Sequence, residues 1–176
     1  MEHRFKYCPK TTSESFLVVA LSRCLLSFDD AISKNDENNK IALPQFIKGE
    51  TVIDMDLVEA DQAFQQGRDR NRSMDLAFAV EDVDSSERCL VLVELKLNHI
   101  DVRRNLKQIE LENKIAGSLL VLKNGIAIYP TFFFIFADDL IQQAINKLFR
   151  FYPDPAVRQT RKAETIQGLK KLFFDY

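Results

Sequence analysis

Two apolar segments on either side of a short polar one constrain the fold of this chain more than any other feature. Residues 73–80 read "SMDLAFAV", residues 88–97 read "RCLVLVELKL", and the residues between them are mostly acidic or hydroxylated. Short apolar runs on both sides of a polar loop predict a β-hairpin. The second run is apolar at consecutive positions, which is typical of a strand that is buried on both faces in the middle of a sheet.

Charged residues interrupt this hairpin. Glu94 and Lys96 stand two positions apart, and both lie on one face because side chains alternate between the faces of a strand. With the loop centred between residues 84 and 85, Asp75 is expected directly opposite Glu94, with the small Ala77 beside it on the same face. Directly opposed residues have Cβ atoms about 5 Å apart. The hairpin therefore predicts two carboxylates and an ammonium group close together.

Two carboxylates held this close repel each other unless a proton or a cation lies between them. A divalent hard cation accepts both as ligands and keeps water in its remaining positions. Lys96 lies roughly 6–7 Å further along the strand, where it can position or help to deprotonate a water, or stabilise charge on a phosphate. The hypothesis is a hydrolytic site with Asp75 and Glu94 as metal ligands. The alternative is a structural ion-pair cluster at the end of the sheet.

Helices are expected before the hairpin. Residues 11–28 predict one helix that is capped at Thr11 or Thr12, with Thr11 and Glu14 as a capping box. Residues 52–58 fit a strand and residues 59–66 fit a helical turn, and the pattern leaves the choice between strand and helix open here.

The second half of the chain predicts further helices and strands. A helix over residues 101–117 begins at Asp101 or Asn98 and ends at Gly117. Residues 118–130 predict two strands around an Asn124-Gly125 turn, and the aromatic run 131–137 predicts a buried strand. Helices over about 138–151 and 160–174 close the chain. The expectation is one α/β domain over residues 1–176, with a core of about 11–136 and a C-terminal helical part of about 137–176.

The order of Asp75, Glu94 and Lys96 resembles the signature of the PD-(D/E)xK nuclease superfamily. There, an Asp begins one strand and a Glu/Asp-x-Lys lies on the next. The resemblance covers about residues 11–136 and implies a restriction-endonuclease-like fold, in which helices flank a mixed β-sheet. It also implies hydrolysis of DNA or RNA phosphodiesters with Mg²⁺ or Mn²⁺. Met74 replaces the Pro that often precedes the signature Asp, a position that varies within the superfamily.

The resemblance implies further site residues. Many members carry a Gln in the helix after the Lys strand, and Gln108 matches it. Many also carry a Glu in the first helix, for which Glu14 is the match and Glu59 a second candidate. For Glu14 the alternative is a plain capping role, and for Gln108 it is a solvated position on the helix.

Basic residues gather around these positions in the sequence. Arg70 and Arg72 precede Asp75 closely, and Arg104 stands four positions before Gln108, which places both on one helical face. Arginines in such places are candidates for contacts with substrate phosphates. The alternative is a charged, solvated loop.

Composition narrows the class of protein. A net charge of −2 excludes a strongly basic nucleic-acid binder, so DNA binding has to depend on local patches. Three scattered cysteines without metal-ligand spacing, and no apolar run of signal-peptide or transmembrane length, favour a cytoplasmic protein without a membrane partner. The first hypothesis is a nuclease that hydrolyses DNA with a water activated by the metal; whether two copies form a homodimer stays open. The alternative is a catalytically inactive binding protein with the nuclease fold, which neutralises a toxin or regulates a protein partner.

Overall fold

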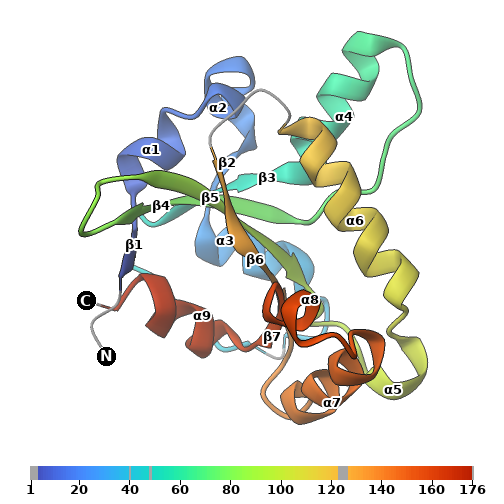
Figure 1. Ribbon diagram of the computed structural model, residues 1–176. Coiled ribbons are helices and arrows are strands. Elements are labelled where there is room, and N and C mark those ends of the chain that lie inside the picture. Colours follow the sequence, from blue (N-terminus) through green and yellow to red (C-terminus); the bar gives the residue numbers. More distant parts are fainter. Residues whose placement is uncertain (1–3, 40, 48, 123–126, 176) are drawn as a thin grey trace.

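A mixed seven-stranded sheet forms the centre of the computed structural model, which describes residues 4–39, 41–47, 49–122 and 127–175 (Figure 1). The strands are β1 (Phe5–Tyr7), β2 (Leu25–Ser27), β3 (Thr51–Asp54), β4 (Leu76–Asp82), β5 (Arg88–Leu95), β6 (Ala127–Ile135) and β7 (Arg161–Glu164). They follow the order β2-β3-β4-β5-β6-β7, and β1 pairs with β4. The β4–β5 pair is antiparallel, whereas β5–β6 and β6–β7 are parallel. The general α/β class is therefore confirmed.

Helices cover this sheet (Figure 1). They are α1 (Pro9–Ser13), α2 (Phe16–Ala20), α3 (Phe28–Asn35), α4 (Met55–Gln66), α5 (Val102–Asn105), α6 (Gln108–Val121), α7 (Ile141–Phe151), α8 (Pro155–Gln159) and α9 (Ile166–Phe173), with a short 3₁₀ turn η1 (Ser22–Cys24). Among the described residues, we find no helix with the length and apolar character needed to cross a bilayer.

The predicted hairpin forms in the predicted register. Ala77 pairs with Leu92 and Ala79 pairs with Leu90. These four side chains belong to one buried cluster, which includes side chains of α2, α4, α6 and α7. The alternate side chains of β4 and β5 belong to a second cluster with α3 and α9. The strand pair is thus buried on both faces, as its continuous apolar sequence predicted.

The helix expected over residues 11–28 is wrong, because three separate helical segments and β2 occupy this stretch. Pro9 begins α1, and its N-cap is Cys8 rather than Thr11 or Thr12. Ser15 then caps α2 by accepting a hydrogen bond from the Val18 N–H. The capping box of Thr11 and Glu14 is therefore wrong as well, since Glu14 lies at the C-terminal end of α1.

The ambiguous segment after residue 50 contains both a strand and a helix. β3 ends at Asp54, whose side chain accepts a hydrogen bond from the Leu57 N–H and caps α4. Gly67 ends α4 in the left-handed conformation, with φ of 61°. The carboxylate at the cap marks the change from strand to helix.

The helix expected over residues 101–117 consists of two helices, α5 and α6, and α6 continues past Gly117 to Val121. Asp101 caps α5 as predicted. The strand expected from residue 118 is wrong, because these residues complete α6. The predicted Asn124-Gly125 turn lies outside the described residues. β6 is one strand that includes most of the aromatic run, and it lies parallel to β5.

The C-terminal part differs from the expectation at two points, because α8 and β7 lie between the two expected helices. α7 agrees with the helix expected to end at Phe151, but the helix expected from Thr160 is preceded by β7 and begins at Ile166. β7 pairs with β6 from Phe132 to Ile135. This strand therefore extends the sheet beyond the core expected over residues 11–136.

Candidate functional site

The hairpin places Asp75 and Glu94 at the same end of the sheet. Asp75 directly precedes β4, and Glu94 is the last residue but one of β5. One carboxylate oxygen of Asp75, Oδ2, accepts a hydrogen bond of 2.7 Å from the Leu95 N–H. This bond orients the Asp75 carboxylate toward β5 and so toward Glu94.

Lys96 follows directly after β5. Its backbone N–H donates a hydrogen bond of 2.7 Å to the Ile135 carbonyl at the end of β6, which holds the backbone beside the sheet. Its Nζ lies 2.7 Å from Glu94 Oε1. The side chain is 15 % exposed, while that of Glu94 is 1 % exposed. The three residues of the predicted signature are therefore brought together.

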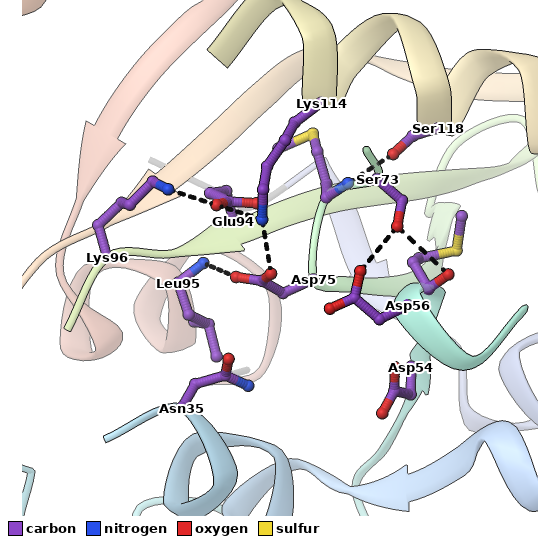
Figure 2. Close-up of polar contacts among 12 residues, drawn as sticks. Asn35, Asp54, Asp56, Ser73, Asp75, Glu94, Leu95, Lys96, Lys114 and Ser118 are labelled. Atoms are coloured by element: carbon purple, nitrogen blue, oxygen red, sulfur yellow. Dashed lines mark hydrogen bonds and ion pairs between the residues drawn. The ribbon is translucent and has the colours of Figure 1, made fainter. Parts of the chain in front are cut away.

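A second lysine, which the sequence did not indicate, completes the site. Lys114 reaches from α6 between the carboxylates, and its Nζ lies 3.0 Å from Asp75 Oδ1 and 2.7 Å from Glu94 Oε1 (Figure 2). One ammonium group thus contacts both acids at once. Lys114 occupies the place between two carboxylates that was expected to hold a divalent cation.

Small residues on α6 bring Lys114 to this position. Gly117 lies against the backbone of Arg72, so closely that an added Cβ would be 1.7 Å from the Arg72 carbonyl oxygen. The next residue, Ser118, accepts a hydrogen bond of 2.8 Å at Oγ from the Met74 N–H. Lys114 is one turn before Ser118 and shares its helix face. In the sequence, the only sign of this arrangement is a lysine one helical turn before a Gly-Ser pair. The pattern can be interpreted only once the packing of α6 is known.

Burial and neighbouring charges perturb the acids. Burial, followed by the Asp75 charge, raises the pKa of Glu94 to about 7, although Lys96 and Lys114 act against the shift. Burial also raises the pKa of Asp75, against the effect of Lys114. Burial would lower the pKa of Lys114, but the two carboxylates outweigh it and raise that pKa. The Oε2 atom of Glu94 is buried and has no hydrogen-bond partner among the described residues.

Two further carboxylates, Asp54 and Asp56, lie near this cluster (Figure 2), but both have other partners. Asp56 Oδ1 accepts a hydrogen bond of 2.9 Å from Ser73 Oγ, and its charge adds to the upward shift of the Asp75 pKa. Asp54 forms an ion pair of 2.6 Å with Lys34. In the described ranges, no group of three or more His, Cys, Asp or Glu side chains has a geometry that could hold a metal ion.

The donor set is still one that a hard cation can use. Mg²⁺ commonly takes one or two protein carboxylates and keeps water in its other positions. Asp75 and Glu94 supply two carboxylates, and Glu94 Oε2 is a buried oxygen that no hydrogen bond from the described residues occupies. The residues therefore fit a divalent ion once the Lys114 ammonium group has left.

The remaining predicted site residues lie apart from this cluster. Gln108 is exposed at the first position of α6, almost two turns before Lys114. Glu14 is exposed, and its charge acts on Arg88, which begins β5 while Glu94 lies near its end. Glu59 is fully buried, and its carboxylate pairs with Arg68 and accepts a hydrogen bond from the Asn71 N–H.

The predicted phosphate-binding arginines are all exposed. Arg70 donates a hydrogen bond of 3.0 Å to the Asp56 carbonyl, and the Arg72 backbone packs on Gly117. Both therefore lie on the segment that enters the site. Arg104 pairs with Asp101 at 3.4 Å on α5. The shared helical face expected for Arg104 and Gln108 is wrong, because α5 ends before Gln108.

Comparison of the chain with protein-family models, with curated proteins and with solved structures gives no match. Asp75, Glu94, Lys96 and Lys114 form what we call the carboxylate–lysine cluster, and its geometry is the basis for a function.

Proposed function

We propose that the protein is a metal-dependent nuclease that hydrolyses phosphodiester bonds of DNA, as the resemblance to the PD-(D/E)xK superfamily implies. The observation that carries the proposal is the pairing of Asp75 with Glu94 around a single positive charge, with Lys96 beside them. Two acids at the ends of paired strands are arranged to share one cation.

Each residue of the predicted signature has a role in this proposal. Asp75 and Glu94 would hold Mg²⁺ or Mn²⁺ with carboxylate oxygens. When bound, the divalent ion supplies positive charge for the attacking water and for the phosphate. Lys96 orients that water and stabilises negative charge on the phosphate oxygens. Water adds to phosphorus, one P–O ester bond breaks, and the products are a phosphate monoester and a hydroxyl group.

The exposed arginines supply the contacts with the nucleic acid. Arg70 and Arg72 lie on the segment that leads into Asp75, so they are placed to bind phosphates next to the scissile one. Arg104 is a separate exposed arginine on α5, where it pairs with Asp101, and Gln108 is an exposed polar side chain at the start of α6. These local positive charges compensate for the slightly acidic chain.

The test is a cleavage assay on plasmid DNA, single-stranded DNA and RNA with Mg²⁺ or Mn²⁺. We expect the wild type to cut DNA and Lys96→Ala to cut at least 100-fold more slowly, since removal of one stabilising donor has an effect of about this size. Lys171→Ala is the matched control, because Lys171 is an exposed lysine on α9. If no substrate is cut, or if Lys96→Ala cuts as fast as the control, the proposal is wrong.

A second candidate function has its own supporting observation. Lys96 and Lys114 together neutralise Asp75 and Glu94 without any metal, as in a degenerate site. The chain would then be a catalytically inactive nuclease-fold protein that binds and regulates another protein. Calorimetric titration with Mn²⁺ separates the two candidates. Absence of bound metal together with absence of cleavage would favour the binding protein.

A further inference from the structure

We propose that Lys114 is a built-in competitor of the divalent cation: its ammonium group occupies the space between Asp75 and Glu94 and has to leave when the metal binds. The inference rests on the proposed function, because it takes these two acids to be the metal ligands. It adds Lys114, which is not part of the Asp75, Glu94 and Lys96 signature, and it adds control of metal binding by that lysine.

The distances make the two cations mutually exclusive. Lys114 Nζ donates a hydrogen bond of 3.0 Å to Asp75 Oδ1 and forms an ion pair of 2.7 Å with Glu94 Oε1. A divalent cation on the same oxygens would lie at about 2.0–2.6 Å from each. Both positions fall in the same small space between the acids, so an ion bound to these two oxygens would overlap the ammonium group.

The two lysines of the cluster differ in a way that favours Lys114 as the one that leaves. Within the described part of the chain, Lys96 forms an ion pair only with Glu94, at Oε1, so it does not bridge the two acids. Lys114 contacts both acids, and its side chain is 22 % exposed. A flexible four-carbon chain can therefore swing into solvent without movement of α6.

The surroundings stay in place when Lys114 leaves. Gly117 and Ser118 hold α6 against the segment around Arg72 and Met74. The Leu95 N–H keeps Asp75 oriented. Glu94 Oε2, which is buried and has no hydrogen-bond partner in the described part of the chain, can bind the incoming ion together with Oε1 of the same carboxylate. The metal ion thus replaces the ammonium group in a site whose other residues are already in position.

Neutral substitutions at Lys114 test this exchange. Lys114→Gln keeps a hydrogen-bond donor for the acids but removes the charge, and Lys114→Met removes both. Titration with Mn²⁺ by calorimetry is expected to show at least tenfold tighter binding for both variants than for the wild type. Lys171→Gln, on exposed α9, should bind as the wild type does. Unchanged or weaker binding by Lys114→Gln would overturn the inference.

A second measurement covers the case in which Lys114→Met does not fold without metal. Because a ligand that binds only the folded state stabilises it, Mn²⁺ should raise the Tm of Lys114→Gln more than that of the wild type. The same measurement on Lys114→Met should show folding that depends on Mn²⁺. An equal or smaller Tm shift in Lys114→Gln than in the wild type would contradict the competition.

The outcomes also separate this inference from the proposed function. If Lys114→Gln binds Mn²⁺ more tightly but neither it nor the wild type cuts nucleic acid, the nuclease proposal is wrong and the competition stands. If the wild type cuts DNA but Lys114→Gln loses affinity for Mn²⁺, the nuclease proposal stands and Lys114 instead supports the metal. If neither protein binds Mn²⁺, both proposals are wrong.

Discussion

Replacement of Gly117 by alanine should separate α6 from the rest of the site. The added Cβ would lie 1.7 Å from the carbonyl oxygen and 2.9 Å from the carbonyl carbon of Arg72. Both are backbone atoms, so no side-chain rotation relieves the contact. Either α6 or the segment before Asp75 has to move, and the hydrogen bond from the Met74 N–H to Ser118 Oγ has to lengthen or break.

Three contributions set the magnitude of the effect. Overpacking of a close contact destabilises by about 1–3 kcal/mol. A buried N–H left without its acceptor costs about 1–3 kcal/mol more. Alanine offsets about 1 kcal/mol of this, because it favours a helix over glycine by that amount. We therefore expect Gly117→Ala to lower the free energy of unfolding by about 3 kcal/mol.

Urea unfolding followed by far-ultraviolet circular dichroism measures this change, with the free energy obtained by linear extrapolation. The matched control is Ala116→Gly at the neighbouring, exposed position of α6, which should lose about 1 kcal/mol from helix propensity alone. If Gly117→Ala were as stable as the wild type, or more stable, the close approach of α6 to Arg72 would be refuted.

Two other predictions concern ionisable groups. Burial raises the pKa of Glu94 from 4.5 to about 7. Protonated Glu94 therefore contributes fully to the stability of the folded state below pH 4.5. This contribution is lost as the pH rises through 7, because Glu94 ionises at a lower pH in the unfolded chain than in the folded one. The free energy of unfolding of Glu94→Gln should therefore rise relative to that of the wild type between pH 4.5 and pH 8. The rise should reach about 3 kcal/mol, at 1.36 kcal/mol per pKa unit. If urea unfolding shows a difference between the two proteins that does not depend on pH, this prediction is contradicted. Tyr152 donates a hydrogen bond of 2.6 Å from its hydroxyl to Glu112, so Tyr152→Phe should destabilise by about 1.5 kcal/mol. An unchanged urea midpoint would show that Arg161, which also binds Glu112, satisfies the acid without the tyrosine.

The hairpin and its register could be predicted because their information is local. Two continuous apolar runs on either side of a short polar loop define the hairpin, and centring that loop between residues 84 and 85 predicted the register. Ala77 pairs with Leu92 as this centring predicted, and the approach of Asp75 to Glu94 follows from the same register.

The helical segments were predicted less well where local signals compete. Residues 119–122 are all apolar and were expected to form a strand, yet they complete or directly follow α6. Within α6, Val121 is buried while Leu119 and Leu120 are exposed. The bond from Met74 to Ser118 holds this turn in helical form, and a partner more than forty positions away in the sequence cannot be recognised from local periodicity.

By itself, the sequence determined the α/β class, the central hairpin and the meeting of Asp75, Glu94 and Lys96, because alternation along paired strands decides which side chains share a face. Only the tertiary structure decided what lies between the acids. Lys114 comes from a helix that packs across the hairpin through Gly117 and Ser118, and the direction of a side chain from one layer into another depends on how the layers pack. The charge that holds the two carboxylates together is therefore a property of the fold, and the Lys114 variants measure whether that charge competes with a metal.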